Sequence, residues 1–213
     1  ELGPLIHTAW TTGLKTPVVV YGPAGLEDYW QAFLTSMAAD IVLRIEDEGR
    51  VDLAGLVEFR TIEAGSIHQE EGLDVTAMRV VHPPLVDCFA LRFAGAGRTV
   101  VMSGDTAYLP ELAAFARAAD LLVHEAMLAA ALPALVARVG TSNDKLMNHL
   151  TRSHTTAGDA ARIAAAAGVG ALALHHLIPS DDPDYTPDDW QAAVSQHWSG
   201  PFHLGRDGLR IPL

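Results

Sequence analysis

Short apolar runs that end at turn residues predict β-strands along much of the chain. The run Val-Val-Val-Tyr at 18–21 is followed by Gly22-Pro23, which is typical of a buried strand that ends in a turn. Residues 73–81 and 88–94 are predicted as two strands joined by a turn around Pro83-Pro84. Three further strands are expected, over residues 99–103, 121–123 and 171–174.

Helical spacing of apolar positions predicts four helices. The first covers residues 25–38, where one face carries Leu26, Tyr29, Trp30, Phe33, Leu34 and Met37. Pro110 suits the first turn of a helix over residues 110–119, and Gly168 suits the position just after a helix over 156–167. A last helix is expected over 188–198, followed by a short C-terminal hairpin, and residues 139–149 are predicted as a mobile loop. Strand–helix units follow residue 99, so the pattern predicts a layered α/β domain.

Composition narrows the class of protein. With 213 residues, 49% of them hydrophobic, the chain can bury a substantial core, and we expect residues 1–213 to form a single domain. A net charge of −12 disfavours a broad nucleic-acid surface, because such surfaces depend on Lys and Arg. The one cysteine, Cys88, excludes an intramolecular disulfide framework and a Cys-rich zinc finger.

The sequence also limits the expected location of the protein. No apolar run approaches the ~18 residues that span a membrane, so we expect a soluble protein with no membrane partner. The first residues, Glu1 to Leu5, carry no basic region and no initiator Met, so they do not form an intact signal peptide. The compartment stays open between the cytoplasm and the periplasm or secretion.

Histidine and aspartate side chains follow several of the predicted strands. His82, Asp105 and His124 each close an apolar run, and the pair His175-His176 closes another. Because the carboxyl ends of buried strands open onto crevices where ligands bind, we expect these side chains to meet there. Imidazole and carboxylate together suit zinc or a related metal, although each residue alone is also explained as a satisfied histidine or a helix-capping aspartate. The other histidines interpreted as structural or surface residues are His7, His68, His149, His197 and His203.

Several motifs together resemble the metallo-β-lactamase superfamily, and most of all its branch of ribonuclease Z and arylsulfatase-like hydrolases. The matching stretches keep the family's order and cover nearly the whole chain. They are Ser-Gly-Asp-Thr at 103–106, Ala-Asp-Leu-Leu-Val-His-Glu-Ala at 119–126, Ser-His-Thr-Thr-Ala at 153–157, Ala-Gly-Val at 167–169, Leu-His-His-Leu-Ile-Pro at 174–179, and the ending Gly-Pro-Phe…Gly-Arg-Asp at 200–207.

This resemblance implies an αββα sandwich with two divalent metal ions at one edge of the sheets, zinc foremost and manganese or iron as alternatives. In the family's pattern Asp105 is the catalytic carboxylate that bridges both metals. His82 would bind the first metal and His176 the second, with the neighbouring His175 as the alternative to His176. His154 matches a catalytic histidine that contacts the scissile group or protonates the leaving oxygen. Four residues would support the ligands from behind: Thr106, His124, Glu125 and His175.

The superfamily signature H-x-H-x-D-H does not occur in this sequence. In the family it lies just before a stretch that resembles residues 1–5 and Ala9-Trp10. We therefore expect the native protein to extend upstream of Glu1 by a layer of strands and the metal loop, and the full ligand set to include residues from that part. The alternative is a homologue that has lost its metals and acts as a binding module.

Two features direct the choice of substrate. Ribonuclease Z of the common bacterial type carries a basic tRNA-binding arm between the counterparts of His82 and Asp105, and the short interval here leaves no room for it. Together with the acidic charge, this favours a small-molecule ester over nucleic acid. We expect a hydrolase of an aryl or alkyl sulfate or phosphate, phosphodiesters included, that uses a metal-bound hydroxide. The alternatives are a ribonuclease Z-like tRNA 3′-processing endonuclease, a lactone or β-lactam hydrolase and an inactive binding module, and the resemblance allows a homodimer.

Overall fold

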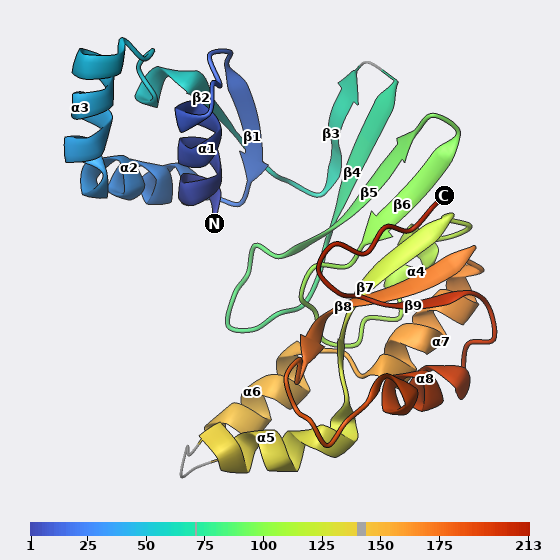
Figure 1. The fold of residues 1–213 in the computed structure, drawn as a ribbon. Helices are drawn as coiled ribbons and strands as arrows, with labels where there is room; N and C mark the ends of the chain where they lie inside the picture. The colour runs from blue at the N-terminus through green and yellow to red at the C-terminus, as the bar shows by residue number, and fades with distance from the viewer. Residues whose placement is uncertain (71, 140–143) are drawn as a thin grey trace. The chain divides into compact units, whose positions relative to one another are not determined.

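Contacts along the chain divide it into two compact units, Glu1–Ile62 and Glu63–Leu213. The computed structural model describes residues 1–70, 72–139 and 144–213 (Figure 1). Each unit has a hydrophobic core of its own. The single domain expected over residues 1–213 stays a prediction, and the two compact units are described in turn.

The first unit combines a pair of parallel strands with helices. β1 (Val18–Gly22) and β2 (Val57–Thr61) pair along their whole length. The helical elements are α1 (Leu2–Thr11), α2 (Leu26–Ser36), α3 (Ala38–Glu48) and the short 3-10 helix η1 (Ala54–Leu56). The helix predicted over residues 25–38 is in fact interrupted at Met37 (φ −100°, ψ 6°), where the backbone leaves the helical region between α2 and α3.

Two tryptophans anchor the core of this unit. Trp10 and Trp30 are buried, and the ring of Trp30 stacks on that of Phe33 with centroids 5.7 Å apart. The indole Nε1 of Trp10 donates to the carbonyl oxygen of Val51 at 2.9 Å, so its polar atom is satisfied inside the core. The other buried apolar residues of the cluster are Ile6, Ile41, Leu53 and Leu56.

Seven strands form one sheet in the described part of the second unit, in the order in which they follow along the chain (Figure 1). Pairing is antiparallel from the first to the fourth strand and parallel from the fourth to the last. The strands are β3 (Gly65–Glu70), β4 (Leu73–Arg79), β5 (Phe89–Gly95), β6 (Arg98–Met102), β7 (Leu121–Met127), β8 (Ala171–Ile178) and β9 (Phe202–Leu204).

Two of the strands are longer than predicted, and the C-terminal hairpin is wrong. β7 and β8 stay paired as far as Met127 and Ile178, with one register irregularity after Glu125. His124, His175 and His176 therefore lie inside strands rather than closing them. After α8 (Pro187–Ser195) the tail does not fold back on itself, because β9 pairs in parallel with β8 and becomes the edge strand.

Helices pack against the parallel half of the sheet (Figure 1). α7 (Ala157–Ala167) contacts both β7 and β8, and its many buried alanines allow this close approach. Thr156 Oγ1 caps α7 by accepting from the backbone N–H of Asp159 at 3.1 Å, and Gly168 (φ +62°) ends it as predicted. The remaining helical elements are α4 (Leu112–Phe115), η2 (Ala129–Ala131), α5 (Leu132–Val139), α6 (Lys145–Ser153) and α8 (Pro187–Ser195).

This arrangement confirms the predicted α/β class and corrects some of its details. The helix predicted over residues 110–119 is shortened to α4, because Ala118 takes a positive φ of 52°. Of the mobile loop predicted over residues 139–149, residues 140–143 lie outside the described residues. The prediction is wrong for residues 145–149, because they belong to α6. Within the described residues, none of the helices combines the length and the apolar character needed to cross a membrane.

His124 is a polar residue in the centre of this core. It is 0% exposed, and its Nδ1 lies 2.7 Å from the carbonyl oxygen of Glu125. A carbonyl only accepts, so Nδ1 carries the proton, while Nε2 is buried without a hydrogen-bond partner among the described residues. Burial lowers the pKa of His124 below 6.5 and outweighs the opposite effects of the hydrogen bond and charge of Glu125.

Leu122 tests the importance of the packing between α7 and the sheet. It is 0% exposed in β7, so Leu122→Ala should lower the free energy of unfolding by about 2–5 kcal/mol. Leu85→Ala is the matched control, because Leu85 is 63% exposed and its truncation leaves no cavity. Urea denaturation of the three proteins measures the difference, and equal stability of the two variants would contradict this account of the core.

His124 should make the stability depend on pH. The unfolded chain takes up a proton near pH 6.5, whereas folded His124 resists it, so its contribution is complete above pH 6.5 and is lost as the pH falls toward the lowered pKa. His124→Asn should therefore cost less stability at pH 5 than at pH 8, by at most about 1.4 kcal/mol for each pH unit. Denaturation midpoints at both values measure this, with His203→Asn on β9 as the control. A cost independent of pH would show that His124 is not held neutral.

Candidate active site

The predicted residues gather where parallel strands end. β6, β7 and β8 are parallel neighbours, so their carboxyl ends lie at one edge of the sheet. Asp105 follows β6, Glu125 belongs to β7 and His176 to β8. His82 follows β4, and His154 caps the C-terminus of α6. Five segments that are distant in sequence thus contribute one side chain each.

Glu125 forms the buried base of the site. Its side chain is 0% exposed, and Oε1 accepts three hydrogen bonds. The donors are the backbone N–H of Thr106 at 3.1 Å, the backbone N–H of Thr155 at 3.0 Å and Nδ1 of His154 at 3.2 Å. Thr155 Oγ1 also donates to the carbonyl oxygen of Thr106 at 2.7 Å, so the loop after β6 and the segment before α7 are joined around the carboxylate.

His154 is oriented by this carboxylate. The residue is 6% exposed, and its Nδ1–H points at Glu125 because a carboxylate only accepts. Burial lowers the pKa of His154, but the hydrogen bond and charge of Glu125, helped by the charge of Asp105, outweigh burial and raise the pKa above 6.5. The ring is therefore held in one orientation and retains its proton more readily than an isolated imidazole.

Asp105 and His176 lie side by side at the more exposed end of the site. Their Oδ2 and Nε2 atoms are 3.6 Å apart, and the ring of His176 stacks on that of His154 with centroids 5.5 Å apart. Gly104, just before Asp105, has φ +60°, and a Cβ there would lie 2.7 Å from the carbonyl oxygen of Phe89. Only glycine allows this tight turn, which places the Asp105 carboxylate.

A cavity of about 540 Å³ opens beside His176. Leu174 and Leu177 give it apolar walls, while Arg206 and Asp207 add charges of both signs at its rim. Such a mixture of apolar surface and a few polar groups is typical of small-ligand sites. The backbone of His176 adopts φ +44°, which is uncommon for a residue other than glycine and is associated with functional sites.

His82 approaches from the other side of His154. The two rings meet edge to face with centroids 4.9 Å apart, and Nδ1 of His82 lies 2.9 Å from the carbonyl oxygen of Ser153. Thr106 Oγ1 accepts from the backbone N–H of Val81 at 3.2 Å, which fixes the segment that carries His82. Thr106 therefore connects two parts of the site, in keeping with the supporting role predicted for it.

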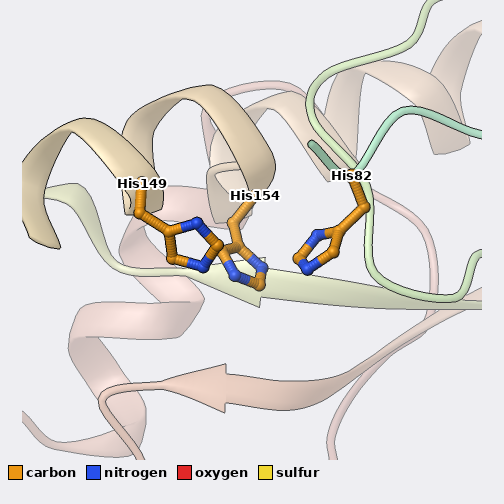
Figure 2. Close-up of side chains that lie close together, drawn as sticks. All are labelled: His82, His149 and His154. Atoms are coloured by element: carbon orange, nitrogen blue, oxygen red, sulfur yellow. The ribbon is translucent and has the colours of Figure 1, made fainter. Parts of the chain in front are cut away.

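His149 is a site residue that the sequence analysis missed. Its ring lies edge to face with those of His82 and His154, with centroids 5.8 Å and 5.7 Å away (Figure 2). Burial lowers the pKa of His149, and the neighbouring charges of His154 and His82 lower it further. The sequence offered one indication of this position: His149 precedes Ser153 by four residues, and this spacing places both side chains on one face of α6.

His175 precedes His176 in β8 and is the more buried of the two. Its Nε2 is buried without a hydrogen-bond partner among the described residues, and burial lowers its pKa, with the charge of His176 adding to the effect. The contact with Asp105 is made by His176 instead. The geometry therefore favours His176 over His175 as the ligand, while the roles of both stay predictions.

The imidazole and carboxylate groups of the site suit a metal ion such as zinc, which accepts both nitrogen and oxygen ligands. Oδ2 of Asp105 and Nε2 of His176 are 3.6 Å apart. This distance is close to the roughly 3.3 Å that separates two ligand atoms of a tetrahedral zinc ion. Two sets of three residues place ligating atoms within 4.8 Å of one another: His82, His149 and His154, and Glu125, His154 and His176. Imidazole nitrogen and carboxylate oxygen are ligands that zinc accepts.

The sequence of the chain matches a known family. A family model described as "Beta-lactamase superfamily domain" matches residues 16–177. A protein named putative ribonuclease Z from Mycobacterium tuberculosis (strain CDC 1551 / Oshkosh) is 27% identical over 216 residues, which cover all of this chain and 93% of that protein. Ribonuclease Z of Mycobacterium bovis (strain BCG / Pasteur 1173P2) is 27% identical, over all of this chain and 74% of its own length.

Solved structures share the fold at lower identity. The metallo-β-lactamase fold protein YhfI from Bacillus subtilis aligns with a TM-score of 0.65 and 19% identity, over 98% of this chain and 70% of that one. The short form of human tRNase Z aligns with a TM-score of 0.59 and 18% identity, over 100% and 74%. These likenesses confirm the fold, and the family model that matches residues 16–177 confirms the family inferred from the motifs at 103–106, 119–126 and 174–179. The chain therefore belongs to the metallo-β-lactamase superfamily of hydrolases.

Proposed function

We propose that this protein is a metal-dependent phosphodiesterase in which His154 delivers the proton to the leaving oxygen. The observation that carries the proposal is the hydrogen bond of 3.2 Å between Glu125 Oε1 and His154 Nδ1, next to the Asp105–His176 pair. One buried carboxylate thus fixes a proton donor beside the residues that suit a metal. This arrangement fits hydrolysis of an ester whose leaving group needs a proton.

Asp105, His176 and His82 are the residues that would hold the metal ions, with Asp105 shared between them. When bound, divalent ions would polarise the scissile oxygen and make water a stronger nucleophile. The other ligands of a dinuclear site must come from groups beyond these three. We expect Thr106, His124, Glu125 and His175 to support these ligands from behind and to fix their orientation.

His154 acts on the leaving group. Because Nδ1–H is held by Glu125, the free position of the ring is Nε2, and a protonated Nε2 can pass its proton to the departing oxygen. The ring of His154 is stacked on that of His176, whose Nε2 lies 3.6 Å from Asp105 Oδ2, so the proton donor lies beside this pair. Glu125 compensates for the positive charge of the imidazolium in this buried position.

The named relatives favour an RNA phosphodiester as the substrate. Proteins called ribonuclease Z match the whole chain at 27% identity, so we place cleavage at the 3′ end of tRNA precursors first. A second candidate, a small phosphate or sulfate ester, is supported by the connection between His82 and Asp105. There β5 and β6 are joined by a tight turn at Ala96-Gly97, which leaves no arm for gripping tRNA. The net charge of −12 also weakens attraction to a polynucleotide.

A substrate panel distinguishes these candidates. The Zn²⁺-loaded protein is assayed with a tRNA precursor that carries a 3′ trailer, with bis(p-nitrophenyl) phosphate and with p-nitrophenyl sulfate. We expect cleavage of both phosphodiesters, with specific release of the trailer. Turnover of the small phosphodiester alone would favour the second candidate, and turnover of the sulfate alone would contradict a phosphodiesterase.

His154 and Asp105 should respond differently to substitution. His154→Ala should lower phosphodiester hydrolysis by about 10²–10⁴-fold while the metal held by Asp105 and His176 stays bound, because the variant keeps these two ligands and lacks the proton donor. Asp105→Ala should lose both turnover and metal. Metal content by mass spectrometry, together with turnover, measures the two effects, with His203→Ala on β9 as the control. Unchanged turnover in His154→Ala would remove this residue from the mechanism, and unchanged metal content in Asp105→Ala would remove Asp105 from the ligands.

A further inference from the structure

Three imidazole rings converge at α6, next to the Asp105–His176 pair. His82 comes from the loop after β4, His149 from the last turns of α6 and His154 from its C-cap (Figure 2). One nitrogen of each ring lies within 4.8 Å of those of the other two. Such convergence of three imidazole donors needs an explanation beyond packing, because His82 and His149 are only partly buried and could turn toward water.

The hydrogen bonds of these rings assign the same tautomer to all three. Nδ1 of His82 lies 2.9 Å from the carbonyl oxygen of Ser153, and Nδ1 of His154 lies 3.2 Å from the Glu125 carboxylate. Both partners only accept, so both Nδ1 atoms carry protons. Nδ1 of His149 lies 3.4 Å from Ser153 Oγ, whose own proton goes to the carbonyl oxygen of Pro83 at 2.8 Å. His149 must therefore donate as well.

Ser153 is the centre of this arrangement. Its carbonyl oxygen orients His82, its hydroxyl orients His149, and the next residue is His154 itself. The residue is 0% exposed, so these contacts are shielded from water. Histidines that bind metals usually donate their second ring N–H to a carbonyl or carboxylate in this way, which leaves the lone pair of Nε2 for the ion.

We propose that His82, His149 and His154 together form a further binding site for one Zn²⁺ or a similar transition-metal ion, which shares His82 and His154 with the proposed active site, and that an ion there inhibits hydrolysis. Three imidazoles and a water molecule complete a tetrahedral zinc site. The ring nitrogens would need to approach from within 4.8 Å to about 3.3 Å, and this approach would require rotation of the partly exposed His82 and His149 side chains. The inhibition rests on the proposed function, because the ion would occupy Nε2 of His154 and draw His82 away from the other metals.

Metal binding is tested first, without reference to activity. The protein freed of metal is titrated with Co²⁺, whose visible spectrum reports tetrahedral coordination, and Zn²⁺ affinity is measured by competition with a chromogenic chelator. We expect His149→Ala to lose one ion of the wild-type stoichiometry, or to bind it more than about tenfold more weakly. Ser153→Ala keeps all three ligands but removes the acceptor for His149, and should weaken the same ion by about 10–100-fold.

Two control variants locate the ion. His203→Ala should bind as the wild type does, and His176→Ala should keep the ion that His149→Ala loses. If His149→Ala binds the same number of ions with the same affinity, the site does not exist. If His176→Ala loses this ion as well, the ion belongs to the Asp105–His176 pair and the proposal is wrong. Circular dichroism of each variant confirms folding, and Ser153→Ala decides the matter if His149→Ala does not fold.

Inhibition is tested separately on the Zn²⁺-loaded protein. Phosphodiester turnover of the wild type should fall as Zn²⁺ exceeds the stoichiometric amount, whereas His149→Ala should resist the excess by more than about tenfold in concentration. Equal sensitivity of both proteins would overturn the inhibitory role even if the ion binds. Absence of turnover at every Zn²⁺ concentration would count against the proposed function, while the binding result would still decide whether the three-histidine site exists.

Discussion

The buried carboxylate of Glu125 is the constraint on which the site depends. An isolated ionised carboxylate is very costly to bury, so it is stable only where donors surround it. Here three donors reach Oε1 from two segments: the loop after β6, and the stretch made of the C-cap of α6 and the residue that follows it. Neither of these segments can move far without leaving a charge unpaired inside the core. The hydrogen bonds that stabilise the fold therefore also set the position of His154.

The strand pattern predicted much of this site, because local sequence determines where a buried strand carries its polar residues. Asp105, Glu125 and His176 were found from apolar runs and motifs, and the structure brings them to one edge of the sheet. The lengths of β7 and β8 could not be predicted, since pairing beyond residues 123 and 174 depends on the partner strand. The parallel pairing of β9 was missed for the same reason: three residues do not show which neighbour they will join.

The first unit shows a second limit of sequence patterns. α1 begins with Leu-Gly-Pro, which has a low intrinsic preference for the interior of a helix, and no helix was predicted there. Its position follows from packing: a Cβ at Gly3 would lie 2.3 Å from the ring of Phe33, so the glycine permits the contact between α1 and α2. Such a requirement appears only when both helices are in place. Tertiary contacts, not local preference, decide this part of the fold.

His149 was missed because its neighbours come from elsewhere in the chain. On α6 it is simply a histidine four residues before Ser153, and its interpretation as a surface residue was reasonable. The helix α6 ends at His154, whose backbone is extended (φ −126°, ψ 160°). The ring of His154 therefore leaves the helix at its C-terminus, where it meets the ring of His149. His82 then arrives from the loop after β4 to complete the group.

His154 connects two chemical environments that compete for it. On one side lies Glu125, wholly buried, whose charge must be balanced from within; on the other lie Asp105 and His176, whose side chains are 39% and 45% exposed. With Nδ1 committed to the carboxylate, Nε2 is left for either a proton or a metal ion, and it cannot hold both. A site that needs His154 as a proton donor must therefore keep transition metals away from it. Since His82 and His149 lie against the same ring, the placement of α6 that would serve the proposed catalysis would also create the means of blocking it.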